Sequence, residues 1–287
     1  MCKVLNVSKS GFYDWHHRQS APPTQTERTR NERCEIVEKV FKEYHNIYGY
    51  RKIYHELKRR SITCSLNTIY ADCKRLGIKS RTRKRYHVRT TNSNHTLPVA
   101  KNVLDRNFKA EKPNEKWLTD ITYVSTQEGW LYVVAIIDMF SRKIIGYAMA
   151  DNMRTELVID ALMMSLRRRR KIADELYLHS DRGVQFSSEQ LREILELVDI
   201  KQSMSRKGDC WDNAPCESWF GKLKTEWIYP NDVYATRKEA ELSLIAYIEM
   251  FYNSRRLHQS LDYRTPNEVD AEYDAKALTT SASKGTM

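Results

Sequence analysis

The stretch from Arg206 to Ile228 reads RKGDCWDNAPCESWFGKLKTEWI, and the interpretation of the whole fold depends on it. It begins as a basic loop, turns at an Asn-Ala-Pro sequence and continues with the spacing of a helix. Glu217 and Lys224 lie seven residues apart, so two helical turns place them on the same face. An exposed ion pair would explain these two residues by themselves, and only the acidic residues upstream favour a functional role. The apolar face predicted for this helix consists of Trp219, Phe220, Leu223 and Trp227.

The composition indicates a two-domain protein with no segment for the membrane or for export. The chain has 287 residues and a mean hydropathy of −0.68, and no apolar run is long enough to span a bilayer. The N-terminus has no apolar core of a signal peptide, so we expect a cytoplasmic protein. The six cysteines form no regular framework and are expected to be reduced. A zinc site is disfavoured because its candidate ligands are poorly spaced, namely His45, His55, Cys64 and Cys73.

Positive charge is concentrated in the N-terminal third. Residues 1–112 contain 25 Lys and Arg against 10 Asp and Glu, whereas the remainder is mildly acidic. Between Lys74 and Arg89 there are eight basic residues and no acidic one. Such a run can be a solvated linker, but the neighbouring motifs favour an arm that binds DNA phosphates. The residues of this arm that we expect to contact DNA are Arg81, Arg83, Lys84 and Arg85.

The N-terminal third has the pattern of helix-turn-helix units. Residues 1–20 predict a partial unit, with a short helix, a turn at Asn6-Val7-Ser8 and a second helix. Residues 27–89 predict a helix-turn-helix domain with the basic arm, and residues 90–112 a linker. A plain helical bundle with a charged surface is the alternative. If the domain binds DNA, four outward residues of its last helix would contact bases and phosphates, namely Asn67, Thr68, Tyr70 and Lys74.

Residues 113–270 predict an α/β domain. Three strand-like segments joined by short turns are followed by alternating helix and strand, in the order β-β-β-α-β-α-β-α. This order is that of a ribonuclease H-like fold, a mixed five-stranded sheet with flanking helices. It would be preceded by the all-α helix-turn-helix domain. Residues 271–287 are expected to form a disordered tail.

Three acidic residues fall where this fold would bring them together. Asp120 lies within the first, otherwise apolar strand, where an unpaired carboxylate is costly. Asp181 closes the fourth strand, and Glu217 is on the helix after the fifth. Converging carboxylates repel one another unless cations lie between them, and oxygen ligands favour Mg²⁺, with Mn²⁺ as a substitute, over zinc. Two such ions suit an in-line displacement at phosphorus, in which Lys224 would hold a DNA phosphate.

Other polar residues near these positions are weaker candidates. Asp209 and Asp212 lie in the loop before the helix, where nothing in the sequence fixes their direction. Asp138 ends the second strand and is expected to cap the following turn. His179 and Asn213 are expected to have structural roles.

The motifs WLTDITY, HSDRGVQF and GDCWDNAPCESWFGKLKTE resemble the DDE catalytic core of insertion-sequence transposases. Thirty-five residues separate Asp181 from Glu217, as in the DD(35)E pattern shared with retroviral integrases. The segments GFYDWHHR, YGYRKIYHELKRR and YNSRRLHQSLDYRTPNEV resemble parts of the second-frame (OrfB) protein of insertion sequence family three. The zinc module of retroviral integrases has no counterpart in this sequence.

This resemblance implies a bacterial transposase acting in the cytoplasm at the nucleoid. Such a protein binds the terminal inverted repeats of its element, cleaves a strand with two Mg²⁺ ions and joins the 3′-hydroxyl to target DNA. It implies double-stranded DNA as partner, a homo-oligomer on DNA, and an upstream-frame subunit or fusion. Two alternatives remain open from the residues, a metal-dependent nuclease that never joins DNA and a non-catalytic DNA-binding regulator.

Overall fold

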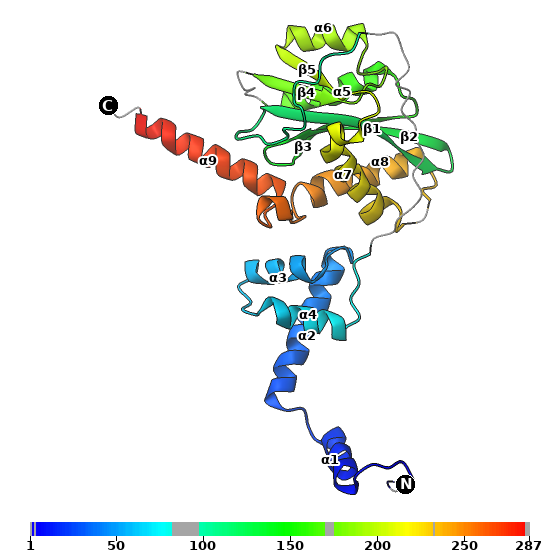
Figure 1. The fold of residues 1–287 in the computed structure, drawn as a ribbon, viewed down its shortest axis with the longest axis vertical. Helices are drawn as coiled ribbons and strands as arrows, with labels where there is room; N and C mark the ends of the chain where they lie inside the picture. Colours follow the sequence, from blue (N-terminus) through cyan, green and yellow to red (C-terminus); the bar gives the residue numbers. More distant parts are fainter. Residues whose placement is uncertain (1, 3, 82–97, 170–174, 232, 285–287) are drawn as a thin grey trace. The chain divides into compact units, whose positions relative to one another are not determined.

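The protein is divided into two compact units. The computed structural model describes residues 2, 4–81, 98–169, 175–231 and 233–284, and the chain separates into Met1–Ser80 and Arg81–Met287 (Figure 1). Within the described residues, no helix has both the length and the apolar character needed to cross a membrane.

The first unit is all α-helical. Its helices are α1 (Lys9–Ser20), α2 (Gln25–Glu43), α3 (Tyr50–Arg59) and α4 (Leu66–Arg75). Helix α2 begins with a capping box, in which Thr24 and Glu27 satisfy each other's backbone N–H groups. Gly77 follows α4 with a φ of 64°, the left-handed end that the sequence predicts. The buried core of α2, α3 and α4 includes Val37, Val40, Ile53, Leu57 and Ile69.

One part of the N-terminal prediction is wrong. We expected a short helix before the Asn6-Val7-Ser8 turn, but the described residues 4–6 form a turn. Helix α1 begins after that turn, where the Ser8 hydroxyl accepts a hydrogen bond from the Gly11 N–H. Val4 and Leu5 are exposed, so no packing energy supports a preceding helix.

The second unit is built on a five-stranded mixed sheet with the predicted order of elements. The strands are β1 (Lys116–Thr126), β2 (Gly129–Asp138), β3 (Ile144–Ala150), β4 (Leu176–Ser180) and β5 (Ile200–Met204). They lie in the order β3-β2-β1-β4-β5. Strands β1, β2 and β3 pair antiparallel, whereas β4 is parallel to both β1 and β5. Strand β1 is therefore the centre of the sheet and the boundary between its two halves.

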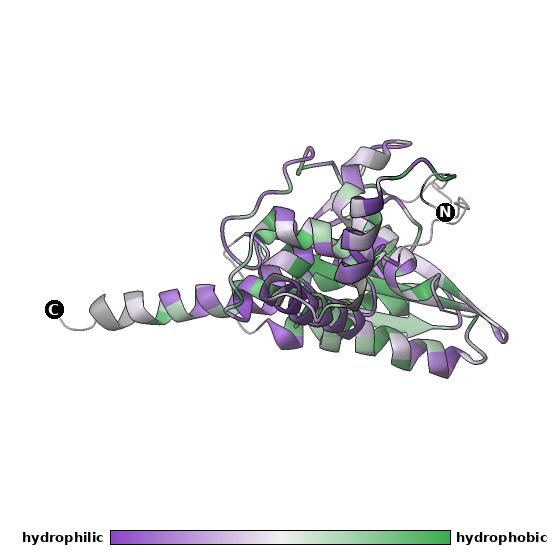
Figure 2. Ribbon diagram, turned by 90° about the horizontal axis from the view of Figure 1, so that it is seen from below, coloured by the Kyte–Doolittle hydropathy of each residue, from purple (hydrophilic) through white to green (hydrophobic). Residues whose placement is uncertain are grey.

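Helices α5 (Thr155–Arg168) and α6 (Glu189–Leu197) cover one face of this sheet. Their apolar residues form one core with Trp117 of β1 and with Val134 and Ile136 of β2. Successive side chains of a strand point to opposite faces, so Leu118 and Asp120 point away from this core. Figure 1 shows α7 and α8 on that other side, and both contact β1. In Figure 2 the hydrophobic strands lie inside a largely hydrophilic exterior.

A glycine lets α5 approach β3 closely. A Cβ atom at Gly146 would overlap the Ser165 hydroxyl and the Ala161 carbonyl oxygen, both on α5. Only glycine fits at this point of strand β3.

Two helices of the second unit continue as π-helical turns. Helix α7 (Ala214–Lys222) runs into η2 (Leu223–Ile228), and α8 (Arg237–Ile245) runs into η3 (Ala246–Tyr252). The predicted apolar face is confirmed, because Trp219, Phe220 and Leu223 are buried, and Trp227 stacks on Phe251 with ring centroids 5.9 Å apart. Short 3-10 turns, η1 (Cys210–Asn213) and η4 (Gln259–Leu261), precede α7 and α9.

The segments predicted as linker and tail contain ordered structure. Residues 90–97 lie outside the described part. Residues 98–112 precede β1 and are packed against the sheet, where Leu104 is buried and the Val103 N–H donates to Ser203 Oγ of β5. Helix α9 (Pro266–Lys284) includes residues 271–284, which we expected to be disordered. It begins where Thr265 and Glu268 bond to each other's backbone N–H groups, and it continues through alanine-rich sequence.

Candidate active site

Asp120 lies in the middle of β1, on the face that α7 covers. Its side chain is partly exposed, and Oδ1 accepts a hydrogen bond of 2.8 Å from the Ile121 N–H. Desolvation raises the pKa of Asp120 well above its ordinary value, and the negative charges of Asp181 and Glu217 raise it further. Lys224 has the opposite effect on this pKa. The other three predicted site residues therefore all lie within electrostatic reach of Asp120.

Asp181 follows the last residue of β4 directly. Its Oδ1 accepts a hydrogen bond of 2.9 Å from the Gly183 N–H, which fixes the turn. In the parallel pairing of β1 with β4, Leu118 is level with His179. Asp120 and Asp181 each lie two residues beyond this last pair, and adjacent strands are about 5 Å apart.

Glu217 is exposed on the first turns of α7. The start of this helix is tied to β1, because Asn213 donates a hydrogen bond of 3.2 Å to the Thr119 carbonyl oxygen. Cys216, beside Glu217, is fully buried, and burial raises the pKa of its thiol. The charges of Asp120, Asp181 and Glu217 raise this pKa further. The charges of all three carboxylates thus act on one buried thiol. The carboxylates come from β1, from the residue after β4 and from α7.

Lys224 lies in the π-helical segment η2 and not in the regular α-helix that its seven-residue spacing from Glu217 suggested. Its Nζ atom is 4.8 Å from the centre of the Tyr123 ring, on the same strand as Asp120. Burial lowers the pKa of Lys224, and Asp120 opposes that shift. The ammonium group therefore lies beside the carboxylates, held on an aromatic face.

The chemistry of this group of side chains fits a hard divalent cation. It offers carboxylate oxygens, and the crowding of their charges is what a cation would relieve. Within the described residues, no three His, Cys, Asp or Glu side chains are already spaced as ligands of one ion. The carboxylates are thus near one another on the face of the sheet that α7 covers, but they do not surround a common point.

The alternative acids in the preceding loop are engaged elsewhere. Asp212 is buried and accepts hydrogen bonds from Arg206, Arg106 and Asn102, including 2.7 Å from Arg206 Nη2. The hydrogen bond from Arg206 lowers the pKa of Asp212 far below its usual range. Asp209 pairs with Arg106. We expected that nothing would fix the direction of these carboxylates, and this expectation is wrong. Arginine side chains fix both of them, and Arg106 is more than a hundred residues away in the sequence.

His179 and Asn213 hold the loop in place. His179 bonds through Nδ1 to Ser203 Oγ at 2.9 Å and through Nε2 to the Asp212 carbonyl oxygen at 2.8 Å. Burial lowers the pKa of His179. Asn213 bonds to β1 through its Nδ2 atom, as described above. Both contacts are structural, as the sequence suggested.

Asp138 caps the turn after β2, also as expected. Its carboxylate accepts hydrogen bonds from the N–H groups of Asn114 and Phe140, and it lies 3.2 Å from Arg169. It faces away from the carboxylate cluster and takes no part in it.

The predicted DNA-binding residues of the first unit lie largely on the surface of α4. Asn67, Tyr70 and Lys74 are exposed, whereas Thr68 is half-buried and hydrogen-bonded to the Ser65 hydroxyl. Arg81 donates to the carbonyl oxygen of Pro230 within the second unit. The other three basic residues of this prediction lie outside the described part of the chain, namely Arg83, Lys84 and Arg85.

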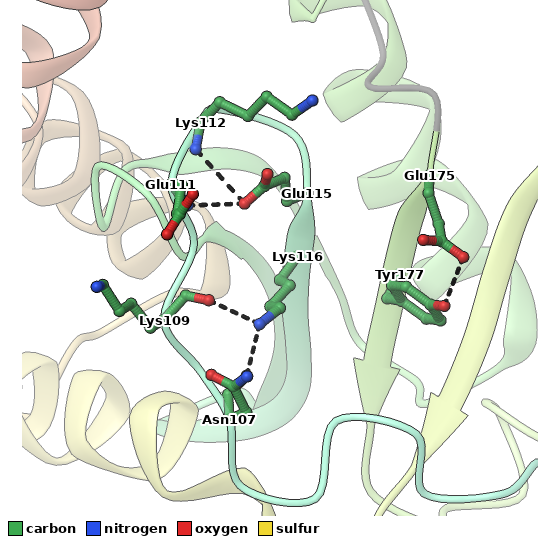
Figure 3. A pocket seen from close by; sticks show the side chains of 8 residues that line it. All are labelled: Asn107, Lys109, Glu111, Lys112, Glu115, Lys116, Glu175 and Tyr177. Atoms are coloured by element: carbon green, nitrogen blue, oxygen red, sulfur yellow. Dashed lines mark hydrogen bonds between the residues drawn. The ribbon is translucent and has the colours of Figure 1, made fainter.

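A polar cavity of about 430 Å³ lies where β1 and β4 begin, away from the end of β4 that precedes Asp181 (Figure 3). Two of its charged side chains bond to backbone groups of the lining. Lys116 donates to the carbonyl oxygens of Asn107 and Lys109, and Glu115 accepts from the backbone of Glu111. This cavity is separate from the candidate active site.

Comparison with known proteins agrees with both units. The chain matches the model of an integrase core domain over residues 110–210 and a second integrase core model over 198–266. Residues 28–86 match an HTH-like domain.

Relatives of similar length belong to insertion elements. The chain is 38% identical to the "Insertion element IS600 uncharacterized 31 kDa protein" of Shigella sonnei, over 96% of this chain and 100% of that one. It is 34% identical to transposase InsF for insertion sequence IS3A of Escherichia coli, over 94% and 92%. Among solved structures, the HTLV-2 integrase catalytic core domain in complex with magnesium is 17% identical, with a TM-score of 0.44 over 56% of this chain and 99% of that one. The chain therefore belongs to the IS3-type family of insertion-sequence transposases, with an HTH-like domain followed by an integrase core.

Proposed function

We propose that this transposase cleaves and joins DNA strands at the ends of its element as a DDE-type polynucleotidyl transferase. The observation that carries this proposal is the gathering of three carboxylates. Asp181 and Glu217 both raise the pKa of Asp120, and all three raise that of the buried Cys216. These acids are separated by 60 and 35 intervening residues in the sequence, so their joint effect on Asp120 and Cys216 supports a site formed by folding. Charge repulsion of this kind is unfavourable and is typical of a site that binds cations.

Asp120, Asp181 and Glu217 would hold two divalent ions, Mg²⁺ or Mn²⁺ in its place. When bound, these ions supply the positive charge that activates the attacking water or hydroxyl and stabilises the leaving oxygen. Asp120 is the central ligand in this assignment, because both other carboxylates act on it. The hard oxygen donors support this choice of metal over zinc.

The remaining side chains would bind and orient DNA. Lys224, held on the Tyr123 ring beside Asp120, would pair with a phosphate near the scissile bond. On the first unit, Asn67, Tyr70 and Lys74 expose polar groups along α4, in the manner of a recognition helix. The basic residues between Lys74 and Arg89 would contact the DNA backbone, which makes binding strongly salt-dependent. Two element ends must be brought together, so we expect a homo-oligomer on DNA, assisted by an upstream-frame subunit or fusion.

The experiment combines purified protein, labelled DNA of the element's terminal repeat and Mg²⁺. Cleavage followed by strand joining supports the proposal. Cleavage without joining indicates a nuclease, and binding without cleavage indicates a regulator. Asp120→Asn, Asp181→Asn and Glu217→Gln should each abolish chemistry while DNA binding persists.

Asp160→Asn is the matched control. This exposed carboxylate is on α5, which covers the opposite face of the sheet, so its neutralisation should leave cleavage unchanged. Undiminished cleavage by any of the three site variants would remove that residue from the active site.

A further inference from the structure

Trp211 is the most exposed of the six tryptophans in the sequence. Its side chain is 67% exposed, in the short turn η1 between β5 and α7. The other five tryptophans each contact another ring or donate a hydrogen bond from the indole. Among the described residues, no aromatic ring contact involves Trp211. A single exposed apolar side chain is common on protein surfaces, so the case depends on how this indole is held and where.

The backbone around Trp211 is fixed by many hydrogen bonds. The Trp211 N–H donates to Asp209 Oδ1 at 3.1 Å. On the other side, the buried Asp212 carboxylate is held by Arg206 Nε at 2.9 Å and by Asn102 at 2.8 Å. The indole is therefore presented to solvent by an ordered turn. Because the backbone of this turn is already ordered, a ligand that covers the indole has only the side chain to immobilise.

The same turn is attached to the strands that carry the candidate carboxylates. His179, two residues before Asp181, bonds to the Asp212 carbonyl oxygen. The Asn213 side chain bonds to the carbonyl oxygen of Thr119, the residue before Asp120. Glu217 follows Trp211 by six residues. The turn that carries the exposed indole is consequently attached to both strands from which Asp120 and Asp181 come.

The loop that leads to Trp211 also carries an exposed positive charge, four residues before it in the sequence. Lys207 is exposed, and it is followed by Gly208, whose φ of 75° turns the chain sharply before η1. A positive side chain next to a flat aromatic surface is the combination by which proteins bind single-stranded nucleic acid. The aromatic face stacks on a base and the cation attracts the adjoining phosphate.

We propose that Trp211 stacks on an unpaired nucleobase at the end of the DNA that is cut. The proposal rests on the proposed function, since it assumes that DNA occupies the carboxylate site. An indole face accepts any of the four bases, so this contact would stabilise a locally opened DNA end without reading its sequence.

The test uses Trp211→Ala, Trp211→Phe and terminal-repeat DNA carrying 2-aminopurine near the cleavage position, with Ca²⁺ in place of Mg²⁺ so that binding is read without cleavage. The wild type should change the fluorescence of one particular nucleotide, because that base leaves the duplex stack. Trp211→Phe should retain most of the change, and Trp211→Ala should lose it. Leu197→Ala is the control for loss of exposed apolar surface, since Leu197 is 86% exposed at the end of α6.

Cleavage in Mg²⁺ provides the second readout. Trp211→Ala should slow cleavage about five- to one-hundred-fold, the range for loss of one base–aromatic stack. On DNA made abasic at the identified position, wild type and Trp211→Ala should cleave equally, because the stacking partner is gone. An equal loss on intact and abasic DNA, or no loss at all, overturns the proposal. Failure of the proposed function gives a different result, namely no cleavage of any DNA by the wild type.

Discussion

The buried ion pair between Arg256 and Glu226 allows a quantitative test of what holds the second unit together. The two side chains are only 5% and 9% exposed, and Arg256 donates two hydrogen bonds to Glu226, of 2.7 and 2.5 Å. Burial alone would lower the pKa of Arg256, but the charge of Glu226 more than reverses this effect and raises it. Glu226 lies in η2 with Lys224, so the pair anchors the π-helical turn that presents the candidate catalytic lysine.

Arg256→Met should destabilise the protein by about 3–5 kcal/mol, because it leaves the buried Glu226 carboxylate without its cationic partner. The double variant Glu226→Met with Arg256→Met removes both charges and fills the same space with apolar atoms. Its stability should lie within about 1 kcal/mol of the wild type. For a unit of this size, the loss in the single variant corresponds to a fall in Tm of roughly 10 °C or more.

Thermal and urea unfolding followed by circular dichroism measure both variants. Glu175→Gln serves as control, since the Glu175–Lys201 pair is exposed on both sides and its removal should leave the Tm unchanged. The reasoning is refuted if the single variant melts with the wild type, or if the double variant is no more stable than the single one.

Three further predictions concern packing, pH and metal. Gly146→Ala should destabilise the protein by about 3 kcal/mol in urea unfolding, because its methyl group would overlap α5. Gly221→Ala lies in helical backbone with open space around it and should stabilise the protein by about 0.5–1 kcal/mol. Equal effects of the two substitutions would contradict this packing. Burial raises the pKa of Asp138 from 3.8 to about 6, so its ionisation opposes folding. The stability of the wild type relative to Asp138→Asn should therefore fall as the pH rises from about 4 to 6, and it should stay level at higher pH. A difference in Tm between the two proteins that does not change across that window would refute this prediction. A chelator should abolish cleavage without unfolding the protein. Asp120→Asn should raise the Tm in chelator, since it relieves repulsion, and should remove the rise in Tm that Mg²⁺ gives the wild type.

The sheet and the acidic residues were predictable because local patterns determine them. Alternating apolar residues and short turns define β1, β2 and β3, and the change to helical spacing at α5 defines the crossover to a parallel strand. Asp120 stands out in the sequence because an acid within an apolar strand requires an explanation. The predicted order of strands and helices then indicated Asp181 and Glu217 as its companions, and the resemblance of the motifs implies the same three acids.

The features that the sequence did not predict depend on distant partners. Asp212 is fixed by Arg106, more than a hundred residues away, and no local pattern indicates that contact. The π-helical turn at Lys224 accompanies packing of Trp227 against Tyr247 and Phe251, which only the folded structure brings together. The exposed Trp211 was also missed, because it lies in the loop before the predicted helix, where no periodic pattern indicates whether a side chain is exposed.

The position of Glu217 late in the chain has a consequence for synthesis of the protein. A ribosome completes unit 1, with its exposed α4, long before it reaches α7. A nascent or prematurely terminated polypeptide that stops before Glu217 lacks one of the three carboxylates, even if its first unit already binds DNA. On the proposed mechanism, the capacity to break a chromosome is acquired only near the end of translation.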